Sequence, residues 1–258
     1  KEFLNLDSRT LSILKSEITR ITNSFVSEYD VLKTFSPPKD ELNFLGFDEV
    51  INNGKIVVLN MNISEYTILS KIISAYLKLD FQTEVLQNLS NNKSKISVFI
   101  CDEYDKYCTK TDGDFFSVSR EAKCINIVST QSYSSLKNAL KDDASVKVII
   151  QNLINKIWFR TDDIFTIEEA QKQLGKENKQ YLSKSISENA KETKFSYITN
   201  SLNSQNSSIT ESINTYTQKD FIYDTNFFTQ SLETFSALTF LSDGNKIYKP
   251  SKIKLYPY

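Results

Sequence analysis

Apolar residues recur along the chain in blocks whose period alternates between that of a helix and that of a strand. A first helical face lies between Asp7 and Tyr29, and a second, longer one begins after Ser64 and continues through Leu89. Short runs of apolar, β-branched residues between the helical blocks predict strands at 56–61, 96–101, 124–129 and 156–160. Strands that alternate with helices predict an α/β fold with a mostly parallel sheet.

Further helices are expected between these strands, and the chain changes character toward its end. The helical candidates lie at 115–122, 133–140, 146–153 and 170–174, the last one opened by a capping box at 166–169. From 176 to 220 Ser, Asn, Thr, Gln and Lys dominate without a lasting periodic face, which predicts a polar, loop-rich segment. The turn residues at 242–245 predict a C-terminal hairpin. We therefore expect three parts, 1–175, 176–220 and 221–258.

Composition excludes much of ordinary enzyme chemistry. The chain has 258 residues, no histidine and a formal net charge of −1. Without histidine there is no Ser-His-Asp triad, no Cys-His dyad and no histidine-ligated metal. The near-zero net charge argues against a surface that binds nucleic acid over its whole extent, and the basic residues Lys137, Lys141 and Lys147 are scattered as on a solvated helix face. We assign no DNA site.

The cysteines and the start of the chain bear on its cellular context. Cys101, Cys108 and Cys124 form no CxxC pair, which predicts reduced thiols and a cytoplasmic environment. No apolar run approaches the roughly 18 residues that span a membrane. The single methionine is Met61, so we expect a segment of a longer protein.

Two adjacent carboxylates, Asp102 and Glu103, follow the apolar strand at 98–101 and give it the form of a Walker B motif. The first carboxylate of such a pair can hold the water shell of Mg²⁺ beside nucleotide phosphates, and the second can orient the attacking water. Acidic residues also end many parallel strands only because they are well solvated there. Taken alone, the motif favours that plain structural role.

Three further polar residues are candidates for the same chemistry. Gln131 follows the next strand and could sense a γ-phosphate, although its neighbours could simply cap the following helix. Arg120 could reach a phosphate or pair with a nearby acidic residue, which is the safer interpretation. Arg160 ends the fourth predicted strand and could act as a finger on a neighbouring subunit's nucleotide, or be neutralised by the acidic residues after it.

A phosphate-binding loop of the form GxxxxGK[ST] is absent from the sequence. Gly54–Lys55 comes nearest, but Glu49 replaces the first glycine and Ile56 replaces the hydroxyl residue. No GxGxxG occurs either. We therefore expect the chain by itself to bind nucleotide poorly or not at all.

Four segments taken together resemble the TraD/TraG group of type IV secretion coupling proteins. They are 98–103, 119–124, 130–136 and 156–163. The resemblance implies a RecA-like P-loop NTPase core that forms a homo-hexamer and uses ATP and Mg²⁺ to drive single-stranded DNA or relaxase–DNA complexes through a secretion channel. It also implies a place at the cytoplasmic face of the cell membrane. In the family, the membrane-anchoring helices and the Walker A segment belong to an N-terminal region, and this sequence contains neither.

The resemblance assigns roles to four candidate residues, whereas Arg120 is a candidate from its own chemistry alone. Asp102 and Glu103 match the Walker B pair, with Asp102 as the metal and cofactor ligand, and Gln131 matches the polar residue after the next strand. Arg120 stands as a phosphate contact and Arg160 as a possible inter-subunit arginine.

The three expected parts receive roles in the same way. Residues 1–175 become the C-terminal portion of the motor domain, with its Walker B and sensor strands, and 221–258 the strands that complete it. The segment 176–220 lies where contacts with relaxosome or channel proteins are expected. Two alternatives stay open, a related double-stranded DNA translocase and a non-catalytic docking module for a relaxosome or channel protein.

Overall fold

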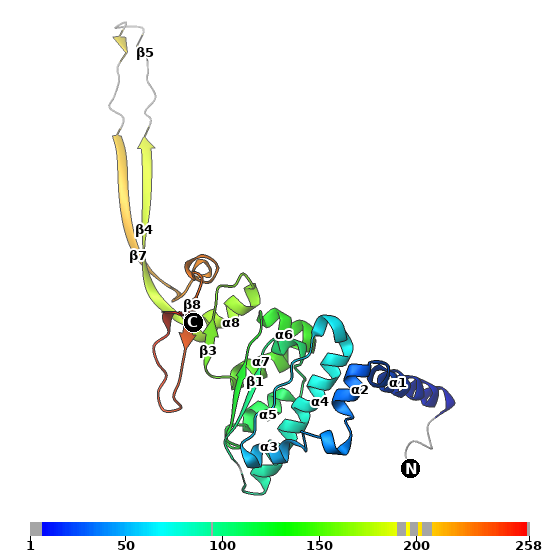
Figure 1. The fold of residues 1–258 in the computed structure, drawn as a ribbon. Coiled ribbons are helices and arrows are strands. Elements are labelled where there is room, and N and C mark those ends of the chain that lie inside the picture. The colour runs from blue at the N-terminus through cyan, green and yellow to red at the C-terminus, as the bar shows by residue number, and fades with distance from the viewer. Residues whose placement is uncertain (1–6, 94, 190–194, 197–200, 203–207, 257–258) are drawn as a thin grey trace. The chain divides into compact units, whose positions relative to one another are not determined.

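The computed structural model describes residues 7–93, 95–189, 195–196, 201–202 and 208–256. The chain forms two compact units, residues 1–154 and residues 155–258 (Figure 1). Each unit has helices and strands of its own, so the fold is mixed α/β.

The first unit begins with helices whose ends are fixed by local side-chain and backbone hydrogen bonds. The Asp7 carboxylate accepts the N–H groups of Arg9 and Thr10, both at 3.0 Å, and so begins the first helix. Asn62, rather than the expected Ser64, caps the long helix through the N–H of Ser64 at 3.0 Å. The helical segments are α1 (Ser8–Ser27), α2 (Tyr29–Phe35), the 3₁₀ turn η2 (Lys39–Glu41), α3 (Phe47–Asn53) and α4 (Ile63–Ser90).

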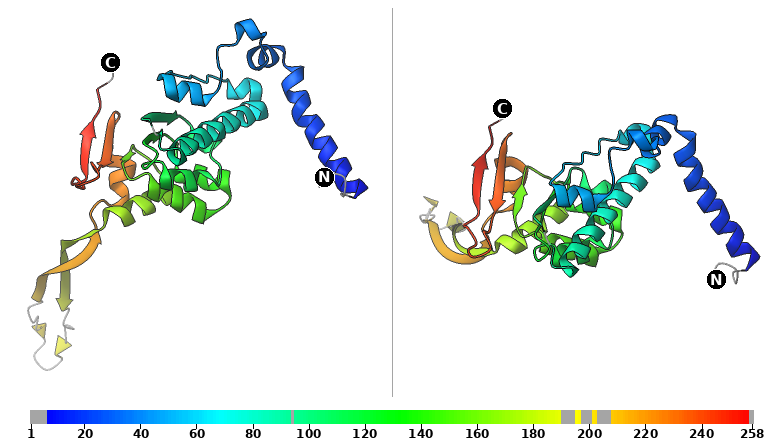
Figure 2. Two further views of the ribbon diagram at one scale, coloured as in Figure 1. Left: turned by 90° about the horizontal axis from the view of Figure 1, so that it is seen from below. Right: turned by 60° about the horizontal axis from the view of Figure 1, so that its bottom comes forward.

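A parallel strand pair forms the sheet of the first unit. Strand β1 (Ser97–Cys101) pairs with β2 (Cys124–Val128) in the register Ser97↔Cys124 to Cys101↔Val128. Helix α4 lies along one face of the pair (Figure 2), where the rings of Phe81 and Phe99 stack with centroids 5.9 Å apart. The remaining elements of the unit are the 3₁₀ turn η3 (Tyr104–Lys106), α5 (Asp112–Val118), α6 (Tyr133–Leu140) and α7 (Asp143–Asn152).

The strand expected at 56–61 is wrong, because residues 55–62 form neither helix nor strand. Ile56 is 89% exposed, and Val57, Val58 and Leu59 are exposed as well. An apolar, β-branched run forms a strand only where a neighbouring strand completes its hydrogen bonds, and no described strand lies beside this one.

The second unit is built on an antiparallel sheet. Strand β3 (Lys156–Trp158) pairs antiparallel with β8 (Ser236–Phe240), which pairs antiparallel with β9 (Ser251–Lys254). The expected C-terminal hairpin is therefore confirmed, whereas the expectation of a mostly parallel sheet holds only for β1 and β2. Helix α8 (Ile164–Leu174) and the π-helical turn η4 (Phe227–Ser231) cover the core of this unit. That core contains Trp158, Ile167, Ala170, Leu174, Phe228, Leu232 and Leu238.

The segment expected to be loop instead forms a long antiparallel hairpin. Strands β4 (Lys176–Asn189) and β7 (Ser208–Phe221) pair over their whole length, and the short strands β5 (Phe195–Ser196) and β6 (Ser201–Leu202) pair beyond them. A two-stranded ribbon packs neither face against a core, so its sequence lacks the apolar alternation by which strands are predicted. The absence of periodicity therefore did not indicate a loop.

The helix predictions succeeded best where a cap coincides with the start of the apolar pattern. Residues 133–140 match α6, and Ser132 caps it by accepting the N–H of Ser135 at 3.0 Å. Helix α8 begins well before 170, because the Asp163 carboxylate accepts the Thr166 N–H at 2.9 Å. Thr166 thus lies inside the helix and does not begin it.

Candidate functional site

The carboxyl ends of β1 and β2 meet at one edge of the parallel pair, and this edge joins Asp102 to Ser129. The Ser129 hydroxyl donates to Oδ1 of Asp102, which also accepts the Glu103 N–H at 2.9 Å. Two backbone bonds hold the edge together, from the Ser129 N–H to the Cys101 carbonyl at 3.0 Å and from the Tyr104 N–H to the Ser129 carbonyl at 2.8 Å. The edge comprising Asp102, Glu103 and residues 129–131 is called the crest below.

The crest keeps Asp102 ionised and open to solvent. Its pKa is lowered from the ordinary value, because the Ser129 hydroxyl and then the Glu103 N–H stabilise the carboxylate. Oδ1 accepts both hydrogen bonds, so Oδ2 is left facing outward and the carboxylate keeps its negative charge. Magnesium is commonly held by one or two carboxylates together with waters and phosphate oxygens. Asp102 fits that role, since it offers one anionic oxygen at an exposed strand end.

Glu103 has an unusual backbone conformation for its residue type. Its φ of 47° and ψ of 44° place it in the left-handed region. That region costs a non-glycine residue about 1–2 kcal/mol. Glu103 turns the chain sharply between β1 and η3, so its own side chain lies at the crest next to Asp102.

Thr130 and Gln131 follow β2 at the same edge, but they have different surroundings. The Thr130 hydroxyl donates to Oδ1 of the buried Asp105 at 3.1 Å and thereby links the end of β2 to η3. Gln131 is exposed. The structure thus brings Gln131 to the same edge as Asp102 and Glu103 and leaves its amide facing solvent.

Arg120 does not lie at the crest, and Arg160 belongs to the other unit. Arg120 belongs to the turn that precedes β2, not to a helix, and β2 runs from Cys124 at the opposite edge of the pair. The full length of the strand therefore separates it from Asp102. Arg160 is exposed and lies in the second unit, after β3. Arg120 therefore does not contribute to the crest of its own chain.

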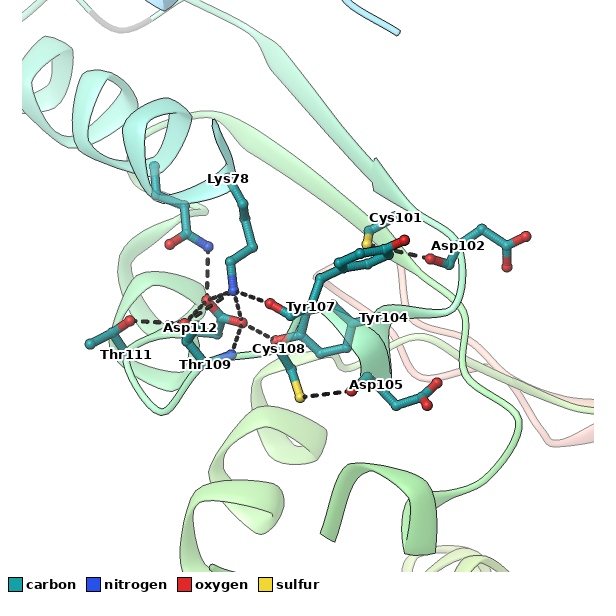
Figure 3. A network of polar contacts seen from close by, with 11 residues as sticks. Lys78, Cys101, Asp102, Tyr104, Asp105, Tyr107, Cys108, Thr109, Thr111 and Asp112 are labelled. Atoms are coloured by element: carbon teal, nitrogen blue, oxygen red, sulfur yellow. Dashed lines mark hydrogen bonds and ion pairs between the residues drawn. The ribbon is translucent and has the colours of Figure 1, made fainter. Parts of the chain in front are cut away.

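A buried ion pair that the sequence did not single out lies behind the crest (Figure 3). The Lys78 ammonium of α4 lies 2.6 and 2.7 Å from the two Asp112 carboxylate oxygens at the start of α5. Their side chains are 3% and 0% exposed. The same ammonium also donates to the Tyr107 carbonyl at 2.9 Å and to the Thr109 hydroxyl at 3.0 Å. The pair therefore connects α4 to the loop between η3 and α5.

Asp112 accepts further hydrogen bonds that leave its carboxylate well satisfied. The Tyr104 hydroxyl donates at 2.5 Å, the Thr109 N–H at 2.9 Å and the Gln82 amide at 3.2 Å. Burial by itself would raise the pKa of Asp112, but the charge and hydrogen bonds of Lys78, followed by the Tyr104 hydroxyl, lower it below its ordinary value. Burial and the Asp112 charge raise the pKa of Tyr104. Together these groups fix η3, the turn that directly follows Glu103.

The sequence does carry a signal for this network. Lys78 and Gln82 lie one helical turn apart on α4, in phase with the buried Phe81 and Val85. A cation and an amide at core positions of a helix require buried partners, because charged groups are almost never fully buried unless they are paired.

The described residues were also compared with the requirements of a metal-binding cluster and of a membrane-spanning helix, and they meet neither. They contain no group of three or more acidic, cysteine or histidine side chains that could hold a metal ion. No helix in that part of the chain is long and apolar enough to cross a membrane.

Comparison with known proteins gives a family match and likenesses to solved structures. Residues 97–222 match the family described as the TraM recognition site of TraD and TraG. Among solved structures, the chain is similar to the bacterial conjugative coupling protein TrwBdeltaN70 in its unbound monoclinic form, with 13% identity and a TM-score of 0.44. That likeness covers 73% of this chain and 37% of the TrwBdeltaN70 chain. No curated protein matches the sequence.

Proposed function

Since residues 97–222 identify the chain as a conjugative coupling protein of the TraD/TraG type, we propose that it supplies the Walker B part of an ATP-hydrolysing motor for conjugative transfer. The observation that carries this proposal is the joining of Asp102 to Ser129 at the shared carboxyl end of two parallel strands. Ligands in parallel α/β sheets bind outside the carboxyl ends of the strands.

Each crest residue has a part in the proposed motor. Asp102 holds the water shell of Mg²⁺, which would supply charge neutralisation for the phosphates of ATP. Glu103 orients the attacking water, and Gln131 contacts the γ-phosphate from the next strand. Arg160 remains a candidate for a neighbouring subunit's nucleotide in a RecA-like hexamer. Arg120 has no part, because it lies at the other edge of the strand pair.

The motor also needs a phosphate-binding loop, and none occurs in the 258 residues. We propose that the loop belongs to a longer protein of which this chain is a part, at the cytoplasmic face of the cell membrane. The proposed cargo is single-stranded DNA or a relaxase–DNA complex. The description of the matched family as a TraM recognition site supports a second role for the same chain, the binding of a TraM-type relaxosome protein.

Calorimetry with Mg-ATP tests the motor proposal. We expect no binding by this chain and measurable binding by a longer form that carries the phosphate-binding loop. Asp102→Ala in the longer form should abolish binding, whereas Asp114→Ala, which removes an exposed carboxylate of α5, should leave it intact. Glu103→Gln should keep binding and lower turnover by about 10²-fold or more, as loss of a positioned catalytic group does.

Two outcomes contradict the proposal. Equal ATP binding by Asp102→Ala and Asp114→Ala would show that the crest does not hold the metal. Unchanged turnover in Glu103→Gln would remove its Walker B assignment and favour the non-catalytic docking module.

A further inference from the structure

The hairpin of β4 and β7 is a long ribbon that no other described strand supports. Its strands pair only with each other, from Lys176↔Phe221 at the base to Asn189↔Ser208. A two-stranded ribbon without packing against a third element is at best marginally stable in water. A hairpin of this length therefore calls for a function that uses its surface.

The base of the ribbon is well anchored to the second unit. The Ile222 N–H donates to the Gly175 carbonyl at 3.2 Å, and the Tyr181 hydroxyl donates to Asp220 at 2.5 Å. The Lys176 ammonium lies 4.5 Å from the centre of the Phe221 ring. These contacts lie at the base alone, so they do not explain the residues farther along the ribbon.

The strand register gives the two faces of the ribbon different chemistry. One face carries Leu182 and Ile213, which are diagonal neighbours across the strands, together with the ion pair of Lys184 and Glu211. Leu182 is 76% exposed and Ile213 is 64% exposed. This face is called the apolar face of the hairpin below.

The opposite face carries short polar side chains and, toward the base, the stacked rings of Tyr181 and Tyr216. Ser183 lies opposite Asn214, and the hydroxyls of Ser185 and Ser212 hydrogen-bond at 2.6 Å. Beyond the tyrosine pair, the hairpin is thus apolar on one face and polar on the other, although it covers no core. Exposed apolar side chains on a ribbon contribute nothing to a core of their own chain, and large exposed apolar positions rimmed by polar ones mark interaction sites.

The charge of the apolar face indicates the class of partner. Lys184 and Glu211 neutralise each other beside Leu182 and Ile213, and the other lysines of this face, Lys176 and Lys219, lie toward the base, so the apolar centre has no net positive charge for a phosphate backbone. An apolar centre with a mixed-charge rim is the anatomy of a protein–protein interface. The hairpin also lies within the span that matches the TraM recognition site of TraD and TraG.

We propose that the apolar face of the hairpin is the docking surface for the TraM-type relaxosome protein. The partner surface is apolar at its centre, where it covers Leu182 and Ile213, and carries charges of both signs at its rim. This inference rests on the proposed recognition of a relaxosome protein, and it deepens that role by naming the surface and the chemistry of the contact.

The test measures the affinity of this chain for the purified TraM-type protein of the same transfer system. The double variant Leu182→Lys/Ile213→Lys places two charges on the apolar face. The matched control Ser183→Lys/Asn214→Lys places the same two charges on neighbouring residues, whose side chains lie on the opposite face. We expect the first variant to weaken binding by about tenfold or more and the control by less than about threefold, because unpaired charges are costly only where the partner excludes water. Circular dichroism of both variants should match that of the unchanged chain.

A second variant separates lost apolar contact from added charge. Leu182→Ser/Ile213→Ser removes the apolar side chains without adding charge and should also weaken binding, by a smaller factor. Equal weakening by the two lysine variants, or none by either, would overturn the docking surface while leaving relaxosome recognition intact.

Other occupants of the face give distinguishable results. If the unchanged chain does not bind the TraM-type protein at all, the proposed recognition itself fails. If sedimentation instead shows self-association that only Leu182→Lys/Ile213→Lys abolishes, the face joins two copies and the proposal is overturned. Retention of single-stranded DNA that is lost in the same variant would overturn it as well.

Discussion

The Lys78–Asp112 pair behind the crest and the Lys184–Glu211 pair on the hairpin join the same kinds of charged group in opposite surroundings. The first is almost wholly buried and hydrogen-bonds to two hydroxyls, an amide and two backbone groups of the loop between η3 and α5. The second is open to solvent on a ribbon without a core. The comparison shows that burial and the surrounding hydrogen bonds, more than the charges themselves, decide what an ion pair does for a fold.

The buried pair fixes the positions of the elements that it joins, whereas the exposed pair is part of the surface of the hairpin. Removing one partner of a buried pair leaves an uncompensated charge in a low-dielectric interior, and this is strongly destabilising. An exposed pair is screened by water and salt and contributes little. The crest thus depends on a network behind it, and the hairpin keeps its charges available for a partner.

The largest expected effect follows from neutralising the buried carboxylate. Asp112→Asn should lower the free energy of unfolding of the first unit by about 3–5 kcal/mol, because the buried Lys78 ammonium loses its counter-ion. Hydrogen exchange of the amides in β1 and β2, resolved by mass spectrometry, measures this unit on its own. The control Asp114→Asn changes an exposed carboxylate of the same helix and should leave the exchange nearly unchanged. Similar acceleration in both variants would contradict the role of the network.

Acid should remove part of the same stabilisation. The folded pKa of Asp112 is depressed, so its contribution is complete above the ordinary aspartate pKa of about 3.9 and is lost as the pH falls toward the folded pKa. Below pH 4 the exchange of β1 and β2 in the unchanged chain should therefore approach that of Asp112→Asn. A constant difference between the two proteins from pH 6 to pH 3 would show that Asp112 does not titrate in this range.

A buried lysine that has no carboxylate partner among the described residues extends the comparison of buried and exposed charges. Burial lowers the pKa of Lys156 in β3 to about 8, and no ion pair to it occurs among the described residues. Its charge costs free energy below pH 8, and that cost fades as the pH rises past the ordinary lysine pKa of about 10.4. Lys156→Met should therefore stabilise the second unit by about 1–3 kcal/mol at pH 7 and by less at pH 10.

The single tryptophan, Trp158, lies in the same strand and reports this unit by its fluorescence during urea unfolding. Lys249→Met, at an exposed position, is the control and should leave the urea midpoint in place. A loss of stability in Lys156→Met at pH 7 would show that the ammonium has favourable partners that outweigh its burial.

The smallest effect is expected for the exposed pair. Lys184→Met should change the free energy of unfolding by about 0–1 kcal/mol, and the change should vanish at high salt. The same fluorescence experiment measures it. A change as large as that of Asp112→Asn would mean that the hairpin contributes to the fold as strongly as the network does.

Local signals in the sequence predicted the elements that carry the crest. An apolar run ending in Asp102 and Glu103 predicted β1, whose Phe99 packs on α4, and the next run predicted β2. The serine that caps α6 could also be predicted from the sequence. Asp102, Glu103 and Gln131 therefore lie at one edge of the sheet, as predicted, whereas their catalytic roles remain a prediction.

What the sequence did not reveal depends on pairing between distant segments. Nothing local shows that 56–61 lacks a neighbouring strand, or that β3 pairs antiparallel with β8. The Lys78–Asp112 pair joins two helices across a strand and a loop, so the apolar phase of α4 indicates that Lys78 is buried but does not identify its partner. The hairpin was missed because both of its faces mix apolar and polar side chains, so its strands lack the alternation by which strands are predicted.

The pairing of the strands determines when each of them can find its partner during synthesis. Strands β1 and β2 are close in sequence, so the first unit can close while later residues are still being translated. Strand β3 has to wait until β8 has been made, with the whole hairpin synthesised between them. During that interval β3 and its buried face are exposed to solvent and to other nascent chains, and long-range antiparallel pairing is slow. In the living cell, then, the second unit is where chaperones would be needed most.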